Sequence, residues 1–89
     1  METVQDEQKG RELGQHIVVL DRGWVYVGLV TELPDRLVLD AASCIRRWGT
    51  TRGLGELRYG PNKGTILDPA GQVIVYRHAV IHMIPCKGF

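Results

Sequence analysis

The chain has 89 residues, 44% of them hydrophobic and 24% charged, with a formal net charge of +1. This length allows one small domain, and no apolar run approaches the roughly 18 residues of a membrane span, so we expect a soluble protein with no membrane partner. Residues 1–12 are polar and net acidic, unlike a secretion signal, and Cys44 and Cys86 lack the CxxC spacing of a zinc site. The composition therefore predicts a cytoplasmic protein with reduced thiols.

The N-terminal segment differs in character from the rest of the chain. Residues 1–15 hold few large apolar side chains, so a helix there would have little to bury. We expect a short helix or a flexible tail over 1–15, followed by one β domain over 16–89. A core this small is marginal, which favours self-association.

The first two strand-forming runs predict a hairpin. Residues 17–20 are β-branched or aliphatic, 21–23 form a turn, and 24–30 alternate between two faces. Gly28 interrupts the alternating run, which indicates a bend or a close approach of another backbone segment.

The later runs complete a mainly β pattern. A third strand-forming run covers 37–40, and 73–84 is a nearly unbroken run that Pro85 ends. Between them lies the glycine-rich segment 41–71, which predicts an inserted β-hairpin. Its strand-like pieces are 44–48, 56–59 and 65–67. Residues 43–65 carry five cations and one anion, so an anionic partner would meet this segment first.

Two runs at opposite ends of the β domain carry a resemblance to a known family. The first is 18–28, VVLDRGWVYVG, in which a second glycine follows the turn glycine by five residues. The second is 76–80, YRHAV, followed by Met83, Ile84 and Pro85. In this order they resemble the Sm-like family, and within it the bacterial Hfq proteins.

The resemblance implies a short helix followed by a strongly bent, five-stranded antiparallel sheet that closes as a small barrel. It also implies a homo-oligomeric ring, in which outer strands pair between subunits, and binding of single-stranded RNA. The chain departs from the family at Pro34, which stands in place of an Asp of the nucleotide pocket, and in the length of 41–71. Within that segment the run 45–57 resembles small uncharacterised proteins of phages and bacteria, from which no function transfers.

The candidate RNA-binding residues fall into two groups. They are Tyr76, Arg77 and His78 in the second run, and Arg46, Arg47, Trp48 and Arg52 in the insert. Cations contact phosphates and aromatic rings stack on bases, which is the chemistry of single-strand binding. On a strand Tyr76 and His78 share one face while Arg77 points to the other. The alternatives are a structural role for 76–78, a solvated or oligomer-contacting insert, and an ion pair of Arg46 or Arg47 with Glu56.

Metal binding and catalysis have little support in the sequence. His78, His82 and Cys86 are spaced by four, which on a strand separates neighbours by about 13 Å, too far for one ion. There is no Ser-His-Asp set and no paired acid suited to catalysis, so we expect neither an enzyme nor a cofactor. Two hypotheses remain: a ring that binds single-stranded RNA, and a structural or interaction ring such as a phage-type accessory or assembly protein.

Overall fold

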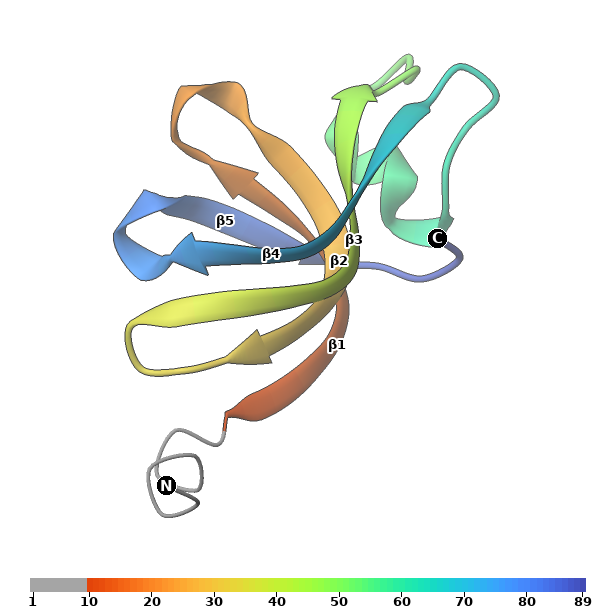
Figure 1. Ribbon diagram of the computed structural model, residues 1–89. Coiled ribbons are helices and arrows are strands. Elements are labelled where there is room, and N and C mark those ends of the chain that lie inside the picture. The colour runs from red at the N-terminus through yellow and green to blue at the C-terminus, as the bar shows by residue number, and fades with distance from the viewer. Residues whose placement is uncertain (1–9) are drawn as a thin grey trace.

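The computed structural model describes residues 10–89, which form a single antiparallel β-sheet (Figure 1). Three short 3₁₀ helices connect its strands. The strands are β1 (Arg11–Leu20), β2 (Val25–Glu32), β3 (Arg36–Arg47), β4 (Ile66–Tyr76) and β5 (Val80–Pro85), and the 3₁₀ helices are η1 (Asp21–Gly23), η2 (Leu54–Tyr59) and η3 (Arg77–Ala79). The expected fold class, a small and mainly β domain built on a bent antiparallel sheet, is confirmed.

The strands lie in the order β4-β3-β2-β1-β5, so the last strand returns to pair with the first. β1 pairs with β2 from Arg11 to Val19 and with β5 from His16 to Leu20. This places β4 and β5 at the two edges of the sheet, each hydrogen-bonded to one neighbour among the described residues.

The sheet bends sharply near the middle of β2 and β3 (Figure 1). The pairing of these strands shifts register between Val27 and Leu29, opposite the point where Ala41 has a φ of 50°. Gly28 lies so close to β3 that a Cβ atom there would stand 3.1 Å from the Asp40 carbonyl oxygen. The close backbone approach expected at Gly28 is therefore confirmed, and it lets the sheet fold over itself.

Both faces of the sheet carry buried side chains, in two separate clusters. Adjacent residues of a strand point to opposite faces, and in β1 Ile17 belongs to one cluster and Val18 to the other. We name the first the loop cluster; its buried members are Ile17, Val25, Val27, Ile45, Leu54 and Leu57. The second, the bend cluster, consists of Val18, Val30, Leu37, Leu39, Ala42 and Val75.

The expectation of a helix or tail over residues 1–15 needs a correction. β1 begins at Arg11, so residues 11–15 are strand, whereas 1–9 lie outside the described residues. The lack of apolar side chains argued against a helix with a buried face. It did not argue against a strand, since pairing with β2 satisfies the backbone groups from Arg11 onward.

The segment 41–71 also differs from a separate inserted hairpin. β3 and β4 continue through it and pair from Ala42 to Arg47, so its strands are extensions of the main sheet. Between these strands the strand-like piece 56–59 is part of the helix η2 instead, and Leu54 and Leu57 from η2 are buried in the loop cluster. The loop 48–65 thus covers one face of the sheet and belongs to the core.

Candidate nucleic-acid interface

Tyr76 and His78 lie together at the junction of β4 and η3. Their rings are stacked, with centroids 6.4 Å apart and planes inclined by 17°. Both side chains are exposed. The pair offers a flat, partly aromatic surface on which a nucleobase can stack.

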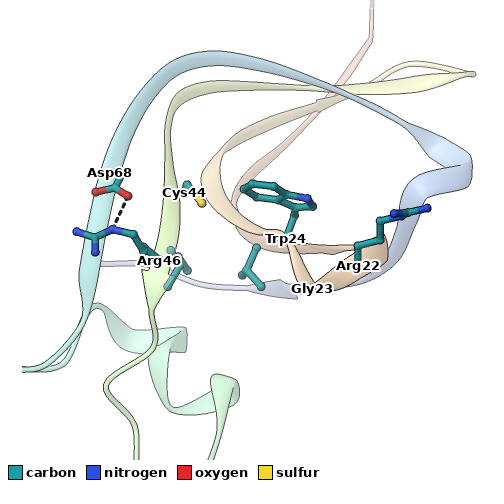
Figure 2. A pocket seen from close by; sticks show the side chains of 8 residues that line it. Arg22, Gly23, Trp24, Cys44, Arg46 and Asp68 are labelled. Atoms are coloured by element: carbon teal, nitrogen blue, oxygen red, sulfur yellow. Dashed lines mark hydrogen bonds and ion pairs between the residues drawn. The ribbon is translucent and has the colours of Figure 1, made fainter.

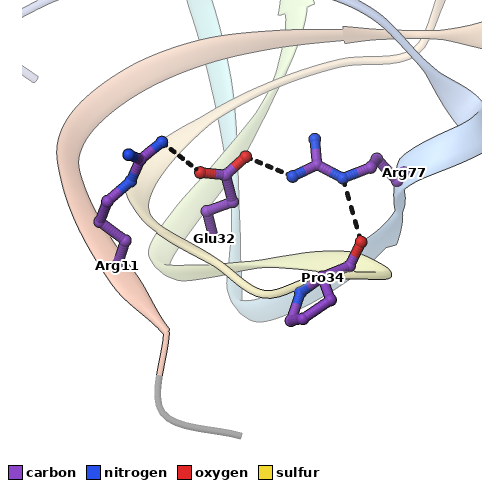
Figure 3. A network of polar contacts seen from close by, with 4 residues as sticks. All are labelled: Arg11, Glu32, Pro34 and Arg77. Carbon is purple, nitrogen blue, oxygen red and sulfur yellow. Dashed lines mark hydrogen bonds and ion pairs between the residues drawn. The ribbon is translucent and has the colours of Figure 1, made fainter.

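Arg77, between these two residues in the chain, is held by an ion-pair network (Figure 3). Its guanidinium forms an ion pair with Glu32, at the end of β2, and its Nε donates to the Pro34 carbonyl oxygen at 3.2 Å. Arg11 completes the network, with Nη2 2.7 Å from the Glu32 carboxylate. The hydrogen bond from Arg77, followed by that from Arg11, lowers the pKa of Glu32 below its usual value. Arg77 therefore fastens η3 to the β2–β3 turn, and it shares the single negative charge of Glu32 with Arg11.

Arg46 is also paired, though not with the residue expected from the sequence. Its Nε lies 2.7 Å from the carboxylate of Asp68, across the β3–β4 pair. Glu56 instead holds the loop: it accepts hydrogen bonds from Thr51 Oγ1 at 2.9 Å and from the Arg52 backbone N–H at 2.6 Å. These bonds, the first from Thr51, lower the pKa of Glu56 despite its partial desolvation. The expected ion pair of Arg46 or Arg47 with Glu56 is wrong.

The remaining predicted residues, at the end of β3 and in the loop after it, are exposed at the far end of β4 from Tyr76. Trp48 follows β3 directly, and the side chains of Arg47 and Arg52 form no ion pair within residues 10–89. The length of β4, 11 residues, separates this loop from Tyr76 by about 30 Å along the strand. The seven candidate residues therefore form two separate surfaces within one subunit.

A pocket of about 340 Å³ beside η1 was not foreseen from the sequence (Figure 2). Its lining residues are Arg22, Gly23, Trp24, Val25, Cys44, Ile45, Arg46 and Asp68. Figure 2 shows the indole of Trp24 between the Arg22 side and the Arg46–Asp68 ion pair. The tight turn that exposes Trp24 has positive φ at both Arg22 and Gly23, 66° and 85°. The sequence feature that could have indicated this pocket is a tryptophan next to a turn. Because Trp24 alternates with Val25 in a strand-forming run, however, the pattern indicated only a strand.

The cysteines and the candidate metal ligands are the remaining reactive side chains of the described residues. Within residues 10–89 no three His, Cys, Asp or Glu side chains gather as a metal site. Burial raises the pKa of Cys86 to about 11, and desolvation, followed by the nearby Asp68, raises that of Cys44. Neither thiol is therefore activated as a nucleophile, which would require a lowered pKa.

Comparison of the chain with protein-family models, with curated proteins and with solved structures found no match. No helix among the described residues is both long enough and apolar enough to cross a membrane.

Proposed function

We propose that the protein assembles into an Sm-like homo-oligomeric ring that binds single-stranded RNA. The observation that carries the proposal is the pair of unlike open edges, β4 and β5, at the two ends of the strand order. Each edge exposes an isoleucine, Ile74 on β4 (50% exposed) and Ile81 on β5 (60% exposed). Open, apolar edges invite pairing with another chain.

The arrangement of the edges favours a closed ring over a two-fold dimer. When the β4 edge of one copy pairs with the β5 edge of the next, the same contact can repeat, because every copy still offers one free edge of each kind. Closure of this head-to-tail series pairs all edges and covers Ile74 and Ile81. Ring closure also buries an interface between subunits, which adds stability to a domain whose small core is only marginally stable alone.

Exposed aromatic residues support the RNA-binding part of the proposal. Four of the six aromatic side chains, Trp24, Trp48, Tyr59 and Tyr76, are exposed instead of filling the core. Stacking on bases is a use for rings in that position, and it tolerates any sequence. Because Arg46 and Arg77 are already paired with acids, we expect stacking to contribute more, and phosphate contacts less, than the count of arginines suggests.

Two measurements test the two parts separately. Light scattering at micromolar protein gives the mass, and a species of 10.0 kDa would refute the ring. Ile81→Lys, which places a charge on the β5 edge, should lower the mass, whereas Leu29→Lys, which places the same charge at a 50% exposed position of the internal strand β2, should not. Loss of mass in neither variant would contradict edge pairing.

Fluorescence anisotropy with labelled oligo-U and oligo-A, at two salt concentrations, tests RNA binding. Tyr76→Ala with His78→Ala should weaken binding by about fivefold or more, the loss expected for one stacked base, while Gln72→Ala should leave it unchanged. Absence of binding by the intact oligomer at low salt would refute the RNA assignment.

The second candidate is a structural or interaction ring that binds no nucleic acid. It is favoured by the ion pairs of Arg46 and Arg77, which withdraw two of the predicted phosphate contacts. Protein purified from cells with no excess of absorbance at 260 nm over 280 nm would favour this candidate. A cytoplasmic location is proposed with either function.

A further inference from the structure

Arg58, Tyr59 and Lys87 form a cationic cluster that neither surface described above includes. The Arg58 guanidinium carbon lies 4.6 Å from the centroid of the Tyr59 ring, and Lys87 Nζ lies 5.7 Å from the same centroid. Tyr59 itself is 66% exposed. Two positive groups therefore share one aromatic ring at the surface.

The charges of this cluster are not offset by an acid. Arg58 donates one hydrogen bond from Nη1 to the Gly55 carbonyl oxygen at 2.9 Å, and neither cation forms an ion pair within residues 10–89. A cation–π contact attracts each cation to the ring but leaves the net charge in place. By contrast, Arg46 pairs with Asp68, and Arg11 and Arg77 share the carboxylate of Glu32. The cluster is thus a concentration of uncompensated positive charge.

The backbone holds the two cations in place from two distant parts of the chain. The Lys87 backbone N–H donates to the Arg58 carbonyl oxygen at 2.9 Å, so the C-terminal segment pairs with the end of η2. Gly88, with a φ of 88°, packs so tightly that a Cβ atom there would lie 2.6 Å from the Tyr59 carbonyl oxygen.

On its far side the same segment is fixed by Gln15 of β1. The Gln15 side chain accepts from the Phe89 N–H at 3.1 Å and donates to the Phe89 carbonyl oxygen at 3.4 Å, and its backbone carbonyl accepts from the Cys86 N–H at 3.0 Å. Lys87 lies between these two attachments, so its Cα position is set before any ligand arrives. Such preorganisation reduces the entropic cost of binding.

We infer that this cluster is a binding site for a phosphate group. It opens onto a shallow pocket of about 230 Å³ lined by Arg58, Tyr59, Pro85, Cys86 and Lys87. A guanidinium, an ammonium and a phenolic hydroxyl are the donors that phosphate oxygens accept from, and an anion between two cations relieves their repulsion. The site stands apart from the proposed RNA binding, since a mononucleotide or inorganic phosphate is enough to fill it.

The test is a titration of the full chain, ¹⁵N-labelled, with inorganic phosphate, uridine 5′-monophosphate and uridine. Phosphate and the mononucleotide should shift the amide resonances of 58–60 and 86–88, and uridine should not. Tighter binding of the mononucleotide than of phosphate would identify a nucleotide as the source of the group, and equal binding would identify phosphate alone. No shift at these amides at low salt, or equal shifts with uridine, would overturn the inference.

Variants separate a built site from general positive charge. Arg58→Gln and Lys87→Gln should each weaken phosphate binding about two- to fivefold, as expected for exposed charges, while Lys63→Gln in the same loop should not. Gly88→Ala retains both cations but displaces the segment that positions Lys87, and it should weaken binding as Lys87→Gln does, with circular dichroism confirming the fold. Equal losses in Lys63→Gln and Lys87→Gln would overturn the assignment.

Discussion

Replacing Leu57 by alanine is the sharpest test of whether the loop 48–65 belongs to the core. Leu57 is 0% exposed and packs in the loop cluster with side chains from β1, β2 and β3, including Ile17 and Val27. Removing a fully buried leucine side chain costs about 2–5 kcal/mol, the transfer term plus the cavity left behind. Against a total stability of about 5–15 kcal/mol this is a large fraction. For a domain of this size each kcal/mol lowers Tm by about 4–8 °C, so we expect a fall of about 8–40 °C.

Thermal and urea unfolding, followed by circular dichroism at one fixed protein concentration, measures the effect. Fixed concentration matters because an oligomer's Tm depends on it. The matched control is Leu29→Ala, since Leu29 is 50% exposed and removing the same atoms there leaves no closed cavity. If Leu57→Ala does not fold, Leu57→Val, which removes one methylene, should cost about 0.8 kcal/mol or more. A loop that projected freely from the sheet would give equal, small effects at both positions and refute the packing described here.

Three further perturbations have defined outcomes. Arg77 lowers the pKa of Glu32 in the folded state, so the ion pair stabilises the protein fully above the unfolded pKa of 4.5 and is lost as the pH falls through the lower folded pKa. The Tm of the parent should therefore fall more than the Tm of Glu32→Gln between about pH 6 and pH 3. Parallel curves of Tm against pH would contradict this. Gly28→Ala places a Cβ 3.1 Å from the Asp40 carbonyl oxygen, so it should lower the free energy of unfolding in urea by about 1–3 kcal/mol. An unchanged urea midpoint would show that β2 and β3 can move apart at no cost. With a pKa of about 11, only roughly one in a thousand Cys86 side chains is a thiolate at pH 8. Cys86 should therefore react with a disulfide reagent at least about tenfold more slowly in the native protein than in urea. Equal rates would indicate that the C-terminal segment is open in the native protein.

The local pattern of the sequence predicted much of the sheet. The alternation of side chains around Val25 and Val27, together with the turn at 21–23, predicted the first hairpin. A strand with one buried face has apolar side chains at every second residue, and a tight turn needs residues that tolerate positive φ. The close approach at Gly28 followed from the same logic. The turn and the alternation depend on neighbours within a few residues, and at Gly28 the missing side chain is itself the signal, although its partner Asp40 lies twelve residues away.

Features that depend on distant partners were not predictable in this way. Arg77 binds Glu32, 45 residues away, and neither residue has a local signal that names the other. Leu54 and Leu57 are three residues apart, a helical spacing, but the glycines around them obscured it and 56–59 resembled a strand. The exposed Trp24 lines a pocket only because β3 and β4 bring Arg46 and Asp68 beside it.

The two buried clusters lie on opposite faces of the sheet, so they can be lost separately when the molecule opens. Ile17 and Val18 are adjacent in β1 yet pack into different clusters, so the side chains that secure the loop are not those that secure the bend. We therefore predict that the loop detaches with loss of one cluster while the other keeps the curved strands paired. Native-state hydrogen exchange should then divide the amides into two tiers, with Gly60, which bonds to the Leu57 carbonyl oxygen, exchanging through a partial opening and Leu39 only through global unfolding. A molecule that opens in this way would present or withdraw the loop surface without dismantling the sheet that carries it.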